Sequence, residues 1–185
     1  MTKLQSGLYL EESNLTGTIP TTLGSLIMLE EIFLRFNALE GPIPTELAQC
    51  QNLKIVDFSN NTLTGDVGPI INMLPRDLTV LDLKYNGFSG TVPTSMGTFT
   101  DLYWLGLGGN NLNGTIPTSL GLLSNLEWLG LHLNRLTGTI PTSLGSLSLL
   151  SKSQSFLFQY SFTTIGSHVC TCSSLQRSCS SMRMT

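Results

Sequence analysis

Few residues in this chain are of the types and spacings that carry chemistry. Three cysteines, Cys170, Cys172 and Cys179, lie near His168 toward the C-terminus. Thiolate and imidazole are zinc ligands, but the spacing C-x-C-x₆-C matches no common zinc site, and cysteines of an unordered tail are the favoured interpretation. The fourth cysteine, Cys50, falls in a column otherwise held by leucines, which predicts a small core residue.

Other catalytic signatures are equally weak. The segment Gly106-Leu107-Gly108-Gly109 has the composition of a phosphate-binding loop, but it lies inside a strand-like unit and precedes Asn-Asn-Leu rather than a helix. The sequence has only two histidines, and it contains no nucleophile elbow, P-loop, kinase or H-E-x-x-H signature. The sequence therefore predicts a protein that is not an enzyme and uses no cofactor or metal.

The spacing of one short motif organises the chain instead. The apolar residue of G-x-I-P, or of its worn copy Gly65–Gly68, falls at positions 19, 43, 67, 92, 116 and 140, in steps of 24, 24, 25, 24 and 24. Upstream of it, copies share the template L-x-x-L-x-L-x-x-N-x-L-x-G-x-I-P, which is clearest over residues 126–141. A fixed period of this length indicates a stacked repeat protein.

Each copy must form a short strand that cannot bury its apolar face alone. The L-x-L core has period two, which puts both leucines on one face, so neighbouring copies must stack into a parallel sheet with a shared core. The Asn column can donate and accept, and we expect it to bridge the backbone of the turn and of the next coil. The Gly column suits a tight backbone position, and the Pro prevents a long helix from starting there.

These residues resemble the leucine-rich repeat family in its plant-type, 24-residue version, over about residues 4–150. The resemblance implies an α/β solenoid: a right-handed superhelix with a parallel β-sheet on its concave face, built mostly of strands, 3₁₀ turns and loops. It also implies that the G-x-I-P half forms extended and 3₁₀ segments on the other side. We assign residues 1–150 to this solenoid, with about six repeats of which the first is partial.

One step is irregular. The segment of residues 68–77, which contains Pro69 and Pro75, is one residue longer than the corresponding segments of the other repeats. Two prolines exclude a regular helix or a central strand across it. We expect the extra residue to bulge on the convex side and to leave the strand register intact.

The side chains that alternate with the core leucines are displayed on the concave sheet, so a binding surface is expected there. Trp104 and Trp128 are predicted to stand beside Gly106, Gly108 and Gly130, as an aromatic wall next to a bare backbone floor. Exposed aromatic residues are typical anchors of interfaces, although stacked copies can also simply pack on each other. The remaining candidate contact residues are Tyr9, Phe33, Asp57, Asp82, Arg35, Lys84 and His132, and a solvated face is the favoured interpretation of the charged ones.

Composition and charge limit the partners. Hydrophobic residues make up 41% of the chain and charged residues 11%, as expected for a leucine-filled stack. Residues 1–150 hold 12 acidic and 6 basic residues, a net charge of −6, which argues against nucleic-acid binding. No apolar run is long enough to cross a bilayer.

Residues 151–185 depart from the pattern. They form a Ser-rich, non-repeat tail with three bases and no acid. Residues 156–162 could form a divergent strand that closes the last repeat, or the tail could be out-of-frame sequence. The absence of a signal peptide and of a cysteine-paired cap leads us to expect a piece of a longer secreted or membrane-anchored protein, with a cytoplasmic location if the chain is complete.

Three N-x-S/T triplets begin at Asn14, Asn60 and Asn113. Glycosylation of these asparagines would mark a secreted surface. Random sequence drift of the repeat template also produces such triplets without any glycosylation. Together these features predict a non-catalytic scaffold that binds a protein or peptide, similar to the ectodomains of plant receptor-like proteins and receptor-like kinases. The alternatives are a secreted enzyme inhibitor that acts through the concave face and a truncated product without independent function.

Overall fold

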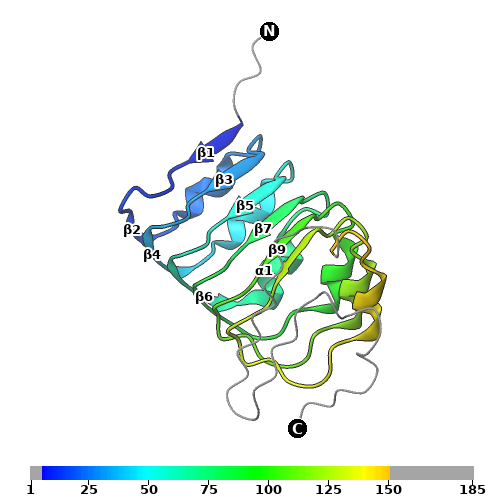
Figure 1. Ribbon diagram of the computed structural model, residues 1–185. Coiled ribbons are helices and arrows are strands. Elements are labelled where there is room, and N and C mark those ends of the chain that lie inside the picture. The colour runs from blue at the N-terminus through cyan, green and yellow to red at the C-terminus, as the bar shows by residue number, and fades with distance from the viewer. Residues whose placement is uncertain (1–5, 151–185) are drawn as a thin grey trace.

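The computed structural model describes residues 6–150, which form one continuous stack of similar coils (Figure 1). The first strand of each coil joins a six-stranded parallel sheet in the order β1-β3-β5-β7-β9-β10, so spatial neighbours follow the order of the repeats. These strands are β1 (Gly7–Tyr9), β3 (Glu31–Phe33), β5 (Ile55–Asp57), β7 (Val80–Asp82), β9 (Trp104–Gly106) and β10 (Trp128–Gly130). The expected parallel sheet and solenoid fold are confirmed.

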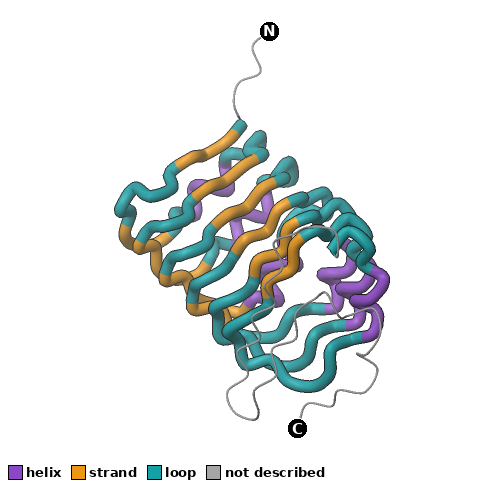
Figure 2. Tube along the Cα trace, viewed as in Figure 1, coloured by secondary structure: helices purple, strands orange, loops and turns teal. Residues whose placement is uncertain are grey.

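A second parallel sheet follows the first. Its strands are β2 (Thr16–Thr18), β4 (Ala38–Pro42), β6 (Thr62–Asp66) and β8 (Gly87–Ser89), paired in that order. Five 3₁₀ helices then complete the coils: η1 (Thr21–Ser25), η2 (Thr45–Gln49), η3 (Thr94–Thr98), η4 (Thr118–Leu122) and η5 (Thr142–Ser146). Figure 2 shows these helices stacked behind the strands, as the family resemblance implies.

The proline of G-x-I-P sets the start of each 3₁₀ helix. The residue before η2 is Pro44, with φ −67° and ψ 136°, and η4 follows Pro117 in nearly the same conformation. A proline ring holds φ near this value, and its missing N–H is not required at a helix start. The recurrent proline therefore ends the extended segment and begins a short turn of helix.

The irregular segment contains a helix, so the prediction that its two prolines exclude one is wrong. The α-helix α1 (Val67–Met73) replaces the 3₁₀ helix of its coil and packs between η2 and η3. Pro69 is its third residue, where the backbone N–H has no intrahelical acceptor, so the proline costs no hydrogen bond. The Asp66 side chain accepts from the N–H of Gly68 (2.8 Å) and caps the helix, which ends before Pro75.

The longer coil leaves the strand register unchanged, as expected. Phe33 pairs with Asp57 and Asp57 with Asp82, although the second step is one residue longer than the first. The α-helical turn absorbs the extra residue within the row of 3₁₀ helices.

The leucine columns form a single core between the two layers. Leu81, Leu83, Leu105 and Leu107 are fully buried, as the L-x-L pattern predicts. Leu10 is an exception, because it follows the edge strand β1 and keeps 39% of its surface exposed. Cys50 is also fully buried in this core, which confirms it as a core residue, and burial raises the pKa of its thiol.

The asparagine column joins the coils, but toward the preceding coil rather than the next. Asn61 donates to Leu34 O (2.9 Å) and accepts from Leu39 N (3.0 Å), both one coil earlier, and also donates to Phe58 O in its own turn (3.2 Å). Each asparagine replaces the ladder partners that the backbone loses where the strand turns. Cys170, Cys172, Cys179 and His168, for which an unordered tail was favoured over a zinc site, lie outside the described residues, and so does the segment 156–162 that could form a closing strand.

Candidate ligand-binding surface

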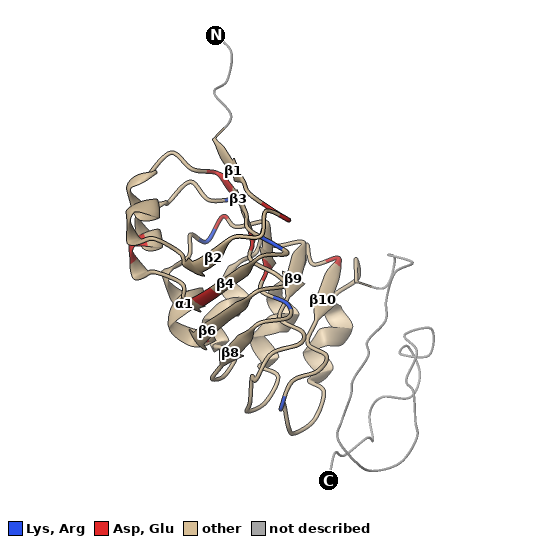
Figure 3. Ribbon diagram, turned by 90° about the vertical axis from the view of Figure 1, so that its left-hand side faces the viewer, with Lys and Arg blue, Asp and Glu red and all other residues tan. Residues whose placement is uncertain are grey.

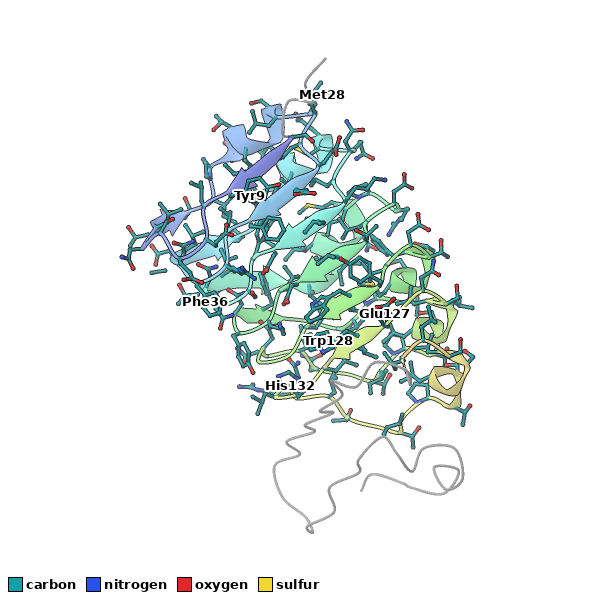
Figure 4. All side chains as sticks on the ribbon, turned by 45° about the horizontal axis from the view of Figure 1, so that its top comes forward. Tyr9, Met28, Phe36, Glu127, Trp128 and His132 are labelled. Carbon is teal, nitrogen blue, oxygen red and sulfur yellow. The ribbon has the colours of Figure 1, made fainter. Side chains whose placement is uncertain are left out.

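The side chains that project outward from the six-stranded sheet, and from the residues directly after each strand, form a surface that we call the strand face (Figure 4). Hydrogen-bonded register aligns its columns from coil to coil. One column reads Gly7, Glu31, Ile55, Val80, Trp104 and Trp128, and the next reads Tyr9, Phe33, Asp57, Asp82, Gly106 and Gly130. The predicted candidate residues therefore lie on one surface.

Trp104 and Trp128 lie at the C-terminal end of the strand face as a parallel stack. Their ring centroids are 4.2 Å apart with an interplanar angle of 8°, and both side chains are half-buried. The indole Nε1 of Trp104 donates to Asp82 Oδ2 (3.0 Å), which fixes the orientation of its ring. The pair thus offers a rigid aromatic edge.

An ion pair between buried Asp82 and half-buried Lys84 supports this stack. Lys84 Nζ lies 3.1 Å from Asp82 Oδ2, and it lies 5.2 Å and 4.8 Å from the ring centroids of Trp104 and Trp128. Burial raises the pKa of the Asp82 carboxyl, and the positive charge of Lys84 opposes that increase. The ammonium group therefore satisfies a carboxylate and two aromatic faces at once.

The bare glycine floor predicted beside the tryptophans is wrong. The Trp128 ring lies over Gly130, the His132 ring over Gly108, and the Asp82 side chain over Gly106, each closer than a Cβ at the glycine would permit. Because glycine has no Cβ, a neighbouring side chain can lie flat against the backbone there. The glycines accommodate the chain's own side chains and leave no open floor.

A hydrogen bond between side chains bridges the β9 coil. The Tyr85 hydroxyl and His132 Nε2 are 3.2 Å apart, and their rings meet edge to face with centroids 5.9 Å apart. Tyr85 belongs to the β7 coil and His132 to the β10 coil, and the Tyr85 ring lies over Gly109 between them. Burial, and then the charge of Lys84, lower the pKa of His132.

Two aspartates in the middle of the strand face are buried, which corrects the interpretation of the charged columns as a solvated face. Asp57 accepts from the N–H (3.0 Å) and the hydroxyl (2.6 Å) of Ser59, and Arg35 Nη1 lies 3.9 Å from its other oxygen. Asp82, on the adjacent strand, is held by Lys84 and Trp104. These carboxylates are structural parts of the surface, whereas the Arg35 side chain keeps 42% of its surface exposed.

A second aromatic stack lies at the N-terminal end. Tyr9 and Phe33 stack with centroids 5.4 Å apart, and the Tyr9 hydroxyl donates to Glu31. That hydrogen bond and burial raise the pKa of Tyr9. Figure 3 shows that acidic residues gather on the coils of β1 and β3, so this end of the molecule is the more acidic one.

The structure adds three residues that the sequence analysis did not select. Tyr85 binds His132, Glu31 binds Tyr9, and Ser59 binds Asp57. Each lies in an aligned repeat position close to a selected residue, so the alignment of the repeats could have identified all three. Asn14 and Asn113 are exposed, whereas Asn60 is half-buried.

Some kinds of site are absent from the described part of the chain. Within residues 6–150, no group of three or more His, Cys, Asp or Glu side chains could hold a metal ion. Over the same range, no helix has the length and apolar character needed to cross a membrane.

Comparison with known proteins finds the Leucine Rich Repeat pattern at residues 77–99, 101–123 and 125–147. Receptor-like protein 39 of Arabidopsis thaliana is 34% identical over 104 residues, which cover 55% of this chain and 12% of that protein. The Brassinosteroid LRR receptor kinase of Solanum lycopersicum is 39% identical over 87 residues, which cover 45% of this chain and 7% of that protein. The chain thus spans about an eighth or less of these relatives.

Solved structures similar to this chain are also plant receptors with leucine-rich repeats. The plant peptide hormone receptor RGFR1 in complex with RGF2 superposes with a TM-score of 0.70 and 38% identity, covering 77% of this chain and 23% of the receptor. The LRR ectodomain of the Arabidopsis thaliana receptor kinase GASSHO1/SCHENGEN3, in complex with CASPARIAN STRIP INTEGRITY FACTOR 2, gives 0.74 and 39%, covering 77% and 17%. Pollen Receptor Kinase 3 gives 0.68 and 31%, covering 75% and 66%.

Proposed function

We propose that this chain, a plant-type leucine-rich repeat protein similar to the ectodomains of receptor-like proteins and receptor-like kinases, is a non-catalytic scaffold whose strand face binds a protein or peptide. Two of the similar ectodomains were solved with the peptide hormone RGF2 and with CASPARIAN STRIP INTEGRITY FACTOR 2. The proposal extends that kind of recognition to this chain.

The contrast between inward and outward columns carries the proposal. The inward columns repeat nearly the same apolar residue in every coil, as in Leu81, Leu105 and Leu129. The outward columns vary along the stack instead: one runs from aromatic residues (Tyr9, Phe33) through acids (Asp57, Asp82) to glycines (Gly106, Gly130). A rigid frame with a varied surface suits recognition, because the backbone is already ordered before a partner binds.

We propose Trp104 and Trp128 as the anchor of the bound partner. The stacked rings are half-buried and held by Asp82 and Lys84, so little side-chain freedom is lost on binding. Pre-organised aromatic residues of this kind often dominate the energy of an interface.

The test is selection of binding partners from a random peptide library against the full chain, followed by affinity measurement by calorimetry. We expect the double change Trp104→Ala and Trp128→Ala to weaken a selected peptide by about 10- to 100-fold, because truncated hot-spot residues cost about 2 kcal/mol or more. A matched control changes the other stacked pair, Tyr9→Ala and Phe33→Ala, which lies at the opposite end of the same sheet. Unchanged affinity in the tryptophan variant would remove the anchor, and the failure of every peptide to bind would count against the scaffold function.

We further propose an extracellular or cell-surface role in recognition and signal transduction, with no direct contact with nucleic acid or membrane from the solenoid itself. The similarity to receptor-like proteins and the net negative charge of residues 1–150 support this proposal. Expression through a secretory pathway, followed by mass spectrometry, tests it. Glycan on exposed Asn14 or Asn113, with less on half-buried Asn60, is the expected result.

A further inference from the structure

Two segments at opposite ends of the stack have nearly the same sequence. Residues 15–26 read LTGTIPTTLGSL and residues 136–147 read LTGTIPTSLGSL, so only Thr22 and Ser143 differ. The first segment belongs to the β1 coil and the second to the β10 coil, which lie at the two ends of the sheet (Figure 1). A contact that the second segment makes with its neighbouring coil is therefore available to the first segment as well.

The packing of the β10 coil on the β9 coil shows what that contact is. Ser143 Oγ donates to Thr118 O (2.7 Å), and Ser146 Oγ donates to Gly121 O (2.9 Å). A Cβ on Gly121 would lie 2.5 Å from Ser143 O, so the following 3₁₀ helix fills the space over this glycine. Two hydroxyl donors and one glycine thus hold adjacent 3₁₀ helices together.

The β1 coil presents the same donor surface at the end of the sheet. Thr22 and Ser25 stand where the β10 coil has its two donor hydroxyls. Leu26 is 48% exposed, whereas Leu147, its counterpart in the β10 coil, is 3% exposed. We call the outer surface of the β1 coil, with Thr22, Ser25 and Leu26, the leading end.

The outer surface of the β10 coil, with Ile140 and Gly145, is the matching acceptor surface, and we call it the trailing end. Ile140 is 39% exposed, whereas Ile116, its counterpart one coil earlier, is 4% exposed. A Cβ on Gly145 would meet no atom of a non-adjacent residue within 4 Å in the described part of the chain. The trailing end therefore has an open place of the kind that a 3₁₀ helix fills over Gly121.

One column of the stack is apolar only at these two ends. It directly precedes the first leucine of each repeat and reads Met28, Asn52, Asp77, Asp101, Asn125 and Leu149. Met28 is exposed and Leu149 is half-buried, so a leading end stacked on a trailing end would bring two apolar side chains together. Charge is also complementary, because the exposed Glu12 lies in the β1 coil and the exposed Arg135 in the β10 coil.

The chain's own next segment is a poorer occupant of the trailing end. The positions that would continue the two core leucine columns of the sheet are Ser153 and Ser155. A coil in that register would place hydroxyl groups in an apolar core, where an unpaired hydroxyl is unfavourable. The β1 coil has Leu8 and Leu10 at the same two positions.

We propose that the leading end of one copy of this chain stacks on the trailing end of a second copy, so that the solenoid continues from chain to chain. Thr22 donates to Thr142 O and Ser25 to Gly145 O of the other copy, and β1 pairs with β10 as the next parallel strand. Because the two surfaces differ, the contact is heterologous and chains add in an open series. The proposal concerns the ends of the stack and does not depend on what the strand face binds.

Sedimentation velocity of the full chain over a wide range of concentration tests the association. The average mass should rise with concentration and pass that of a dimer. Amide exchange in β1 should slow over the same range, because the strand gains a partner. A monomer at every concentration, which is the result expected if residues 151–185 cover the trailing end, would overturn the proposal.

A substitution at Gly145 tests the contact without disturbing the coil. We expect Gly145→Ala to weaken the association at least 10-fold, because its Cβ would meet the 3₁₀ helix of the second copy as a Cβ on Gly121 would meet Ser143 O. The unfolding midpoint at a concentration where both proteins are monomeric should be equal or higher. Asn111→Ala, at an exposed position of the β9 coil, is the control and should associate as the wild type does. Unchanged association of Gly145→Ala would contradict the proposed contact.

Two blocked variants determine the orientation. Leu26→Glu blocks the leading end, and Gly145→Glu blocks the trailing end, so each variant alone should remain monomeric. An equal mixture should form a dimer that grows no further, because one free end of each kind remains. Association of either variant alone, or a mixture that stays monomeric, would overturn the head-to-tail arrangement.

Discussion

At the scale of single residues, amide side chains connect one coil to the next. Asn110 is buried and donates to Leu83 O (3.0 Å) in the preceding coil and to Leu107 O (3.1 Å) in its own. Its Oδ1 accepts from Phe88 N (3.1 Å), also in the preceding coil. One amide group thus serves the backbone of two coils, which explains why the same residue type recurs in the column.

Removing that amide should be costly. We expect Asn110→Ala to lower the free energy of unfolding by about 2–4 kcal/mol, because at least two buried backbone groups lose their partner and each costs about 1–3 kcal/mol. Urea unfolding followed by circular dichroism measures the change. Asn111→Ala is the control, since Asn111 is exposed and should stay within about 0.5 kcal/mol of the wild type. Similar losses in the two variants would refute the structural role of the column.

His132 makes a pH-dependent contribution. Burial and Lys84 lower its pKa, so the folded state binds a proton less readily than the unfolded state. Its contribution to stability is complete above about pH 6.5, the ordinary histidine pKa, and is lost as pH falls toward the lowered value. Burial raises the pKa of nearby Asp82, which acts in the opposite direction as the pH falls.

A comparison of variants isolates the histidine. We expect the unfolding midpoint of His132→Gln to fall less steeply than that of the wild type as the pH decreases below 6.5. Tyr85→Phe keeps His132 but removes its hydrogen-bond partner, so it should retain the steep dependence. Parallel pH profiles for His132→Gln and the wild type would show that this side chain does not titrate differently in the folded state.

At the scale of elements, the 3₁₀ helices stack through a second glycine column that sequence analysis did not single out. A Cβ on Gly97 would lie 2.5 Å from Ser119 O, and one on Gly121 would lie 2.5 Å from Ser143 O. Glycine at this place lets adjacent 3₁₀ helices approach backbone to backbone. A Cβ on Gly145, the last glycine of the column, would meet no atom of a non-adjacent residue within 4 Å among the described residues.

This difference provides a matched pair of substitutions. We expect Gly121→Ala to lower the free energy of unfolding by about 1–3 kcal/mol, because a methyl group would force two helices apart. Gly145→Ala should be neutral or stabilising by up to about 1 kcal/mol, because alanine reduces the freedom of the unfolded chain. Thermal and urea unfolding of both proteins measure the difference, and equal effects would contradict the proposed close packing.

At the scale of the whole molecule, backbone contacts join neighbouring coils, and only a few side chains, such as Tyr85 on His132, reach two coils away within residues 6–150, so stability depends on position along the stack. Leu78, Leu81 and Leu83 in the β7 coil are fully buried, whereas Leu8 and Leu10 in the β1 coil are only partly covered. Stacked repeats can open from an end while the remaining coils stay folded.

Hydrogen exchange should therefore follow the order of the coils. We expect slow amide exchange in β5 and β7 and exchange at least 10-fold faster in β1, measured by mass spectrometry of peptic fragments. Uniform protection from β1 to β7 would indicate that the described residues unfold only as a unit.

The sequence by itself determined the repeat, the parallel sheet and the aligned columns. These follow from local rules, since L-x-L alternates across a strand and a period of 24 or 25 residues returns each coil to the same register. Tertiary structure decided which residues of each column are covered and which are exposed to solvent. Whether Gly130 is open or covered depends on the rotamer of Trp128, and whether Asp57 is solvated depends on Ser59 and Arg35.

The helix at α1 and the left-handed backbone at Phe36, Tyr85 and Leu133 (φ 53° to 56°) were also decided by tertiary contacts. Pro69 is compatible with a helix only because it falls in the first turn, a position that the sequence pattern did not reveal. Phe36, Tyr85 and Leu133 have no preference for left-handed backbone, and hydrogen bonds from adjacent coils impose it on them. The periodic pattern specifies which residues align, and packing between coils specifies the conformation and exposure of each one.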